Sequence, residues 1–126
     1  MGFSHVLPNR DSRAGAGRPR ILHPTALLTV EVAKDAQRVT VHLCGELDFA
    51  SAPDLASRVP EFPRAVDEVV VDLRRLAFCD VAGMRALHRY CVEQLDAGRE
   101  VRVIGARPYF RKVSAITGLV PQCREG

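Results

Sequence analysis

Alternating hydrophobic and polar positions in the first half of the chain predict an antiparallel β-hairpin. Leu28, Val30 and Val32 alternate with more polar neighbours, and the same period of two returns over residues 39–43. The polar stretch at residues 34–37 joins the two alternations and predicts the connection between the strands. The second strand is expected to end at Gly45, because a residue without a Cβ can adopt a bulge or a positive φ at low cost.

A short helix is predicted directly after the hairpin. Ser51 is expected to cap it, and Asp54 three residues later completes a capping box. Leu55 and Val59 then form a buried stripe, and Pro60 keeps the helix short.

The second half of the chain alternates apolar strands with helices. The apolar run at residues 69–73 predicts a strand buried on both faces. A period close to 3.6 predicts the longest helix over residues 81–96, ended by Gly98, and a strand at 101–104 and a helix at 108–117 follow. The buried stripe of the long helix is expected at Met84, Leu87, Cys91 and Leu95. The order β-β-α-β-α-β-α predicts an α/β domain, with a mixed sheet of about four strands and helices packed on it.

Length and charge define the predicted domain boundaries. The 126 residues suffice for one domain, which we place at residues 25–120, after a flexible basic leader at 1–24 and before a tail at 121–126. The leader holds four of the 18 basic residues and one of the 15 acidic ones, so residues 25–126 carry 14 of each. A neutral domain has no electrostatic footprint for a phosphate backbone, so we expect no nucleic-acid partner.

Several classes of site and location lack support in the sequence. No apolar run approaches the roughly 20 residues that cross a bilayer, and no secretory signal is present, so a cytoplasmic protein without membrane insertion is expected. The four cysteines lack the spacing of a metal site or disulfide framework. The glycines form no phosphate-binding loop, and neither His42 nor His88 has a catalytic partner in the sequence pattern. We therefore expect neither an enzyme nor a bound cofactor or metal.

The turn before the long helix is the strongest candidate for function. Asp80 can accept hydrogen bonds from the first free N–H groups of the helix. Gly83 is a poor helix residue, costing about 1 kcal/mol relative to alanine. Its backbone is needed either for close packing of a neighbouring strand or for close approach of a partner, and the residues alone favour packing.

Three features together resemble the STAS domain, the fold of bacterial anti-sigma factor antagonists. They are the strand exit Gly45-Glu46-Leu47-Asp48, the Val-Val-Val-Asp-Leu strand at residues 69–73, and the turn Phe-Cys-Asp-Val-Ala-Gly-Met at residues 78–84. The resemblance covers about residues 27 to 120. It favours a partner rather than packing as the reason for Gly83.

The resemblance implies a partner-switching regulator of bacterial transcription. Such proteins bind an anti-sigma factor that is also a serine kinase, which releases a sigma factor, and phosphorylation of the serine just before the family's glycine breaks the complex. This chain has Ala82 at that serine position, so the usual switch is absent. The partner-binding residues that the resemblance implies are Asp48, Ser51, Asp80, Val81, Ala82, Gly83, Met84 and Arg85.

Several alternatives stay open at this stage. Without the serine, the chain is a constitutive antagonist, binds a partner that is not a kinase, or has kept the fold and lost the role. A different class is a STAS regulatory subunit of a transporter or sensory complex, and another is a STAS domain that binds a small ligand. Homodimer formation is also open.

Overall fold

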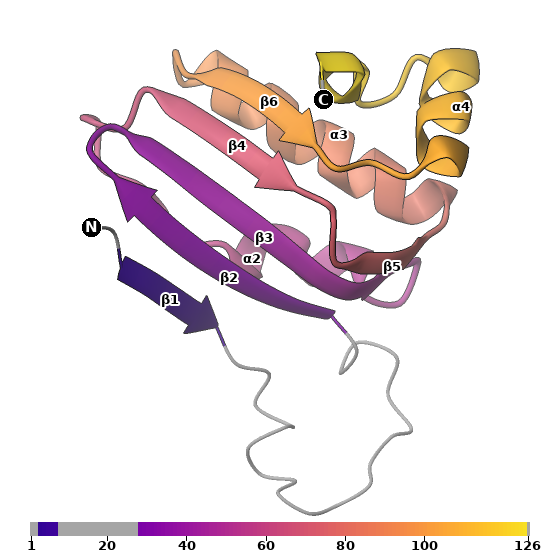
Figure 1. The fold of residues 1–126 in the computed structure, drawn as a ribbon, viewed down its shortest axis with the longest axis horizontal. Helices are drawn as coiled ribbons and strands as arrows, with labels where there is room; N and C mark the ends of the chain where they lie inside the picture. The colour runs from indigo at the N-terminus through magenta and orange to yellow at the C-terminus, as the bar shows by residue number, and fades with distance from the viewer. Residues whose placement is uncertain (1–2, 8–27, 126) are drawn as a thin grey trace, which may run out of the picture.

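The computed structural model describes residues 3–7 and 28–125, which form an α/β domain with one mixed sheet. Its elements are β1 (Phe3–Leu7), β2 (Leu28–Asp35), β3 (Arg38–Leu47), η2 (Ala52–Asp54), α2 (Leu55–Arg58), β4 (Glu68–Asp72), β5 (Leu76–Cys79), α3 (Val81–Asp96), β6 (Glu100–Ile104), α4 (Pro108–Thr117) and η3 (Pro121–Glu125). In Figure 1, α2 and α3 lie behind the sheet, and α4 and η3 lie beyond its β6 side. The predicted element order is confirmed, with two additional strands.

The sheet combines an antiparallel half with a parallel half. Its order is β1-β2-β3-β4-β6, with β5 paired to β3 beyond the end of β4. The β1–β2 and β2–β3 pairs are antiparallel, whereas the β3–β4, β3–β5 and β4–β6 pairs are parallel. The parallel pairs need crossover connections, and α2 and α3 supply the helices of two of them.

Two of the six strands were not expected from the sequence. β1 lies in the segment expected to be a flexible leader, where it pairs with β2 from Phe3↔Lys34 to Leu7↔Val30. The rest of that predicted leader lies outside the described residues. β5 is only four residues long and has two exposed residues, Ala77 and Phe78, so its hydrophobic pattern is too short to predict a strand. β3 also continues past Gly45 (φ 98°) to Leu47, because its last three residues pair with β5, with a shift of register between Gly45 and Glu46.

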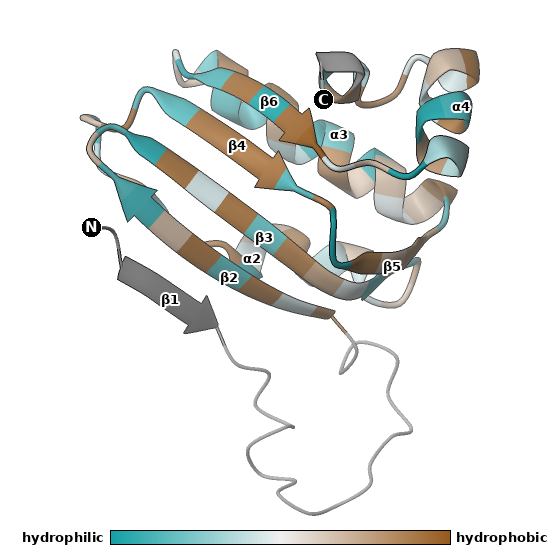
Figure 2. Ribbon diagram, in the orientation of Figure 1, coloured by the Kyte–Doolittle hydropathy of each residue, from teal (hydrophilic) through white to brown (hydrophobic). Residues whose placement is uncertain are grey.

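The core lies between the sheet and the helices behind it. Alternate residues of β2 and β3 point inward, as their hydropathy pattern predicts, and β4 is hydrophobic along most of its length (Figure 2). The central inward side chains are Val30, Val32, Val39, Val41, Leu43, Val69, Val71, Val101 and Val103. On the opposite face of β4, Val70 is also buried, beside ion pairs from Glu68 to Arg38 (2.9 Å) and Arg102 (3.2 Å).

The long helix α3 has the predicted bounds and most of the predicted stripe. Met84, Leu87 and Cys91 are buried, but Leu95 is 43% exposed, so its place in the stripe was wrong. Tyr90 is buried instead, because the helix packs against α2 and η2 as well as against the sheet. The helix ends as expected before Gly98, whose φ is 88°.

The C-terminal segment extends the domain beyond the boundary expected at residue 120. Cys123 in η3 is fully buried, and η3 packs on β6. Gly118 ends α4 in the left-handed conformation (φ 79°), and the Val120 N–H then donates to His88 Nδ1 at 3.0 Å. His88 is thus a half-buried structural acceptor rather than a solvated side chain.

Candidate functional site

Asp80 ties together two segments that are far apart in the sequence. One carboxylate oxygen, Oδ1, accepts from the Gly83 N–H at 2.8 Å and so caps α3, as predicted. The other, Oδ2, accepts from the Phe49 N–H at 3.0 Å in the loop after β3. The Asp80 N–H also donates to the Leu47 carbonyl at 3.3 Å. We call this junction of residues 47–51 and 79–83 the Asp80 turn.

A second carboxylate, Asp48, organises the loop side of the Asp80 turn. Its Oδ1 accepts from the N–H groups of Ala50 (3.0 Å) and Ser51 (3.1 Å). The Ser51 hydroxyl accepts from the Asp48 N–H at 3.0 Å and lies 3.1 Å from the Glu46 carbonyl, to which it can donate. The predicted capping box was therefore wrong, since Ser51 makes no side-chain cap bond to η2 and is instead fully buried within this loop.

Gly83 is required by packing inside the protein. A Cβ at this position would lie 2.2 Å from the Leu47 carbonyl oxygen and 3.0 Å from Cys79 Sγ, so no side chain fits. Because Gly83 and Met84 are both buried, they support the surface of the Asp80 turn from below. The residues alone favoured close packing of a neighbouring strand as the reason for this glycine, and the contact with Leu47 of β3 confirms it.

The other predicted site residues lie at or near the surface. Val81 is 44% exposed, Ala82 and Asp80 are half-buried, and Arg85 is exposed one turn further along α3. Asp48 is half-buried beside them in the loop. The structure therefore brings the predicted residues together, but divides them into a buried support (Ser51, Gly83, Met84) and an accessible surface.

Two exposed aromatic residues were missed as site residues. Phe49 is 74% exposed and follows Asp48, while Phe78 is 51% exposed and precedes Asp80 by two residues. Large exposed aromatic side chains are enriched at protein interfaces. The sequence did contain a signal, because each phenylalanine lies within two residues of Asp48 or Asp80, the aspartates that organise the turn. We call Phe49, Phe78 and Val81 the apolar patch.

A separate polar cluster lies at the end of β4. Asp72 is 4% exposed and accepts from Arg74 Nη2 at 2.7 Å, from the Arg74 N–H at 2.9 Å, and lies 3.0 Å from His42 Nδ1. Burial alone would raise the pKa of Asp72, but the hydrogen bonds and charge of Arg74, with the charge of His42, outweigh it and lower the pKa to about 2. These groups are satisfied by one another, which is typical of a structural cluster.

The cysteines of the described residues have no disulfide bonds. Burial, with the charges of Asp80 and Asp48, raises the pKa of the Cys79 thiol to about 12. Burial, with Cys123, does the same for Cys91. A thiol with such a pKa is almost wholly protonated near neutral pH and is a poor nucleophile. Within residues 3–7 and 28–125, no group of three or more His, Cys, Asp or Glu side chains is placed to hold a metal ion.

The helices of the described region are all too short or too polar to span a bilayer.

The comparisons place the chain near STAS domains. A family model described as "Mlab, STAS domain" matches residues 30–120, while no curated protein matches the sequence. The chain is similar to the STAS domain of an antisigma-factor antagonist from Rhodobacter sphaeroides (30% identity, TM-score 0.51), with 62% of this chain and 84% of that chain covered. It is also similar to an anti-sigma factor antagonist from Mycobacterium paratuberculosis (25% identity, TM-score 0.58), with coverage of 72% and 78%.

The same fold occurs within a much larger protein. The murine anion transporter Slc26a9 has a TM-score of 0.60 with the chain at 15% identity, over 73% of this chain. The matched part is 16% of that transporter's chain.

Proposed function

This chain belongs to the STAS domain family, and on that premise we propose that it is an anti-sigma factor antagonist that binds its partner through the Asp80 turn. The partner is an anti-sigma factor of the serine-kinase type, and binding releases a sigma factor for transcription. The likeness to two anti-sigma factor antagonists, at 30% and 25% identity, supports this choice. The protein acts by binding rather than by catalysis, and in the bacterial cytoplasm.

The observation that carries the proposal is the exposed apolar patch around a rigid turn. Phe49 and Phe78 present two large rings to solvent, and Val81 lies at the start of α3 between the capping carboxylate and Ala82. The carboxylates of Asp80 and Asp48 each accept two backbone N–H hydrogen bonds beneath this patch, so the patch is preorganised. A preorganised apolar surface loses little conformational freedom on binding.

Ala82 makes the proposed interaction independent of phosphorylation at this position. It has no hydroxyl, and the nearby Ser51 hydroxyl is fully buried among the Asp48 loop contacts. We infer a constitutive antagonist, because position 82 never carries the negative charge of a phosphate group. A carboxylate at position 82 would imitate the charge of the family's phosphoserine, and the N-terminus of α3 would tolerate it.

The experiment combines partner identification with a matched charge substitution. Tagged protein is recovered from its native cells, the associated proteins are identified by mass spectrometry, and the partner is then purified for measurement of Kd. Ala82→Glu is compared with Ala82→Gln, which has the same size without the charge. We expect Ala82→Glu to weaken binding at least tenfold relative to Ala82→Gln, because the charge must be buried against an apolar interface.

The apolar patch is tested separately. Phe49→Ala is expected to weaken binding about thirtyfold, as for an aromatic residue at the centre of an interface. Ile116→Ala on α4 removes a side chain of similar exposure, 75%, and serves as the control. Equal binding by Phe49→Ala and the original chain would refute the proposed surface. Recovery of a transporter or sensory component in place of an anti-sigma factor would refute the proposed partner.

A further inference from the structure

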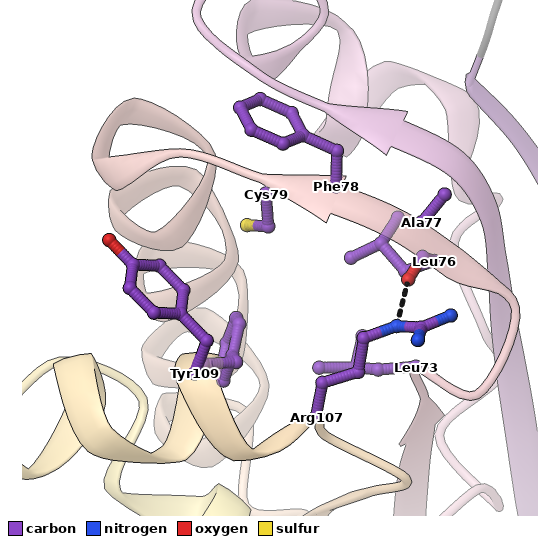
Figure 3. A pocket seen from close by; sticks show the side chains of 8 residues that line it. Leu73, Leu76, Ala77, Phe78, Cys79, Arg107 and Tyr109 are labelled. Carbon is purple, nitrogen blue, oxygen red and sulfur yellow. Dashed lines mark hydrogen bonds between the residues drawn. The ribbon is translucent and has the colours of Figure 1, made fainter.

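A pocket of about 160 Å³ lies between β5 and the first turn of α4 (Figure 3). Its inner wall is formed by Leu73, Leu76 and Phe110, which are 2%, 4% and 7% exposed. Tyr109 lies on the α4 side and is 72% exposed, so it borders the opening. A volume of roughly 150 Å³ is enough to hold benzene in an apolar protein cavity, so this pocket suits a group the size of one ring or one branched chain.

One cation belongs to the lining of this otherwise apolar pocket. Arg107 is exposed, and its Nε donates to the Leu76 carbonyl at 3.1 Å, the bond drawn in Figure 3, so the guanidinium lies beside β5. The bond uses one of the five N–H donors of an arginine. Within the described part of the chain, Arg107 forms no ion pair, whereas Arg38, Arg75 and Arg102 each pair with a glutamate.

The chemistry of the lining selects one class of ligand. Apolar side chains favour a hydrocarbon group, and the remaining N–H donors of the Arg107 guanidinium match the two oxygens of a carboxylate. We propose that this pocket binds a small apolar monocarboxylate, with its ring or branched chain against Leu73, Leu76 and Phe110 and its carboxylate at Arg107. The inference stands without the proposed function, because it uses Leu73, β5, α4 and the residue that precedes α4, and no protein partner.

A ligand in this pocket would touch the strand that leads into the Asp80 turn. Cys79 lines the pocket, and the next residue is Asp80 itself. The pocket and the apolar patch therefore share β5, and Phe78 belongs to both. A bound ligand would therefore contact Phe78, a residue of the proposed partner surface.

The test uses nuclear magnetic resonance of the full chain labelled with ¹⁵N. Benzoate is the probe, benzyl alcohol provides the same ring without the charge, and acetate provides the charge without the ring. We expect benzoate to shift the amide signals of Leu76, Ala77, Cys79 and Phe110 in a saturable way. Benzyl alcohol and acetate should each bind at least tenfold more weakly, because each lacks one of the two matched groups.

Substitutions then assign the carboxylate contact. Arg107→Gln should weaken benzoate binding about tenfold or more and leave benzyl alcohol binding unchanged, while Arg107→Lys, which keeps the charge, should retain an intermediate affinity. Arg111→Gln removes an equal charge from an exposed position one turn further along α4 and should have no effect. The amide spectrum of each variant without ligand shows whether the fold is retained.

Three outcomes would overturn the inference. The first is the absence of saturable benzoate shifts at the pocket amides. The second is equal binding of benzoate and benzyl alcohol, which would make the pocket a nonspecific apolar hollow or a seat for a partner's side chain. The third is an equal loss of benzoate binding in Arg107→Gln and Arg111→Gln, which would indicate only long-range attraction by the surface charge of α4.

Discussion

Replacing Gly83 by alanine would place a methyl group where α3 meets the end of β3. In an ordinary helix this change stabilises, because alanine is favoured over glycine by about 1 kcal/mol. Here the added Cβ would lie 2.2 Å from the Leu47 carbonyl oxygen and 2.8 Å from its carbon. Ordinary contact begins at 3.4 Å, so the two backbones must separate by about 1 Å.

The cost of that separation can be worked from the contacts it disturbs. The obstacle is backbone, and the Leu47 carbonyl is held by the Asp80 N–H, while Asp80 in turn caps Gly83 and binds Phe49. Overpacking costs about 1–3 kcal/mol, and loss of the cap adds about 1 kcal/mol. After the helix preference of about 1 kcal/mol is subtracted, we expect Gly83→Ala to lower the free energy of unfolding by about 1–3 kcal/mol.

Urea unfolding followed by circular dichroism measures this change, with two other glycines as controls. Gly98 and Gly118 have φ values of +88° and +79° and open space around an added Cβ. Alanine there should cost about 1 kcal/mol through backbone strain alone. A Gly83→Ala protein more stable than the original would refute the packing argument, and so would a cost no larger than at Gly98.

Three further predictions concern single groups of the described structure. Asp80→Asn should lower the free energy of unfolding by about 1 kcal/mol and Asp80→Ala by about 2 kcal/mol in urea titrations, because asparagine can accept only one of the two N–H bonds with its oxygen. The pKa of Asp72 lies at about 2, below its ordinary value of 3.8, so its stabilisation is complete above about pH 4 and is lost as the pH falls towards 2. Arg74→Ala should raise that pKa and shrink the difference in stability between pH 7 and pH 3 by about 1 kcal/mol, a result that an unchanged difference would contradict. Because burial raises the pKa of Cys79 and Cys91 to about 12, both should react slowly with a thiol reagent at pH 8 until urea unfolds the chain.

The sequence predicted the elements whose signal is local. The alternation along residues 28–43 depends only on which side chains face the core, and the bounds of α3 and α4 follow from Asp80, Gly98 and Gly118. Strands β1 and β5 could not be predicted in the same way. β5 gains its backbone partners only because β3 continues beyond the last residue of β4, so its pairing depends on tertiary structure and not on a local pattern.

The sequence predicted where the candidate site lies, but not which of its residues are buried supports and which form the accessible surface. Ser51 has the right spacing for a helix cap, and no local rule reveals that the Asp48 loop captures its hydroxyl. For Gly83, the local penalty indicated that something required a glycine, but only the path of β3 shows that the Leu47 carbonyl fills the space. The exposure of Phe49 likewise depends on the loop that the two aspartates fold.

The pairing of β1 with β2 has a consequence for self-association. β1 lies at the outer edge of the sheet (Figure 1) and occupies the β2 backbone groups from Val30 to Lys34. A sheet edge with free N–H and C=O groups is a template for strands of other molecules. Removing residues 1–7 would turn β2 into such an edge, eight residues long and with Leu28, Val30 and Val32 among its residues. We therefore expect β1 to limit edge-to-edge aggregation, a role distinct from any contact with a partner.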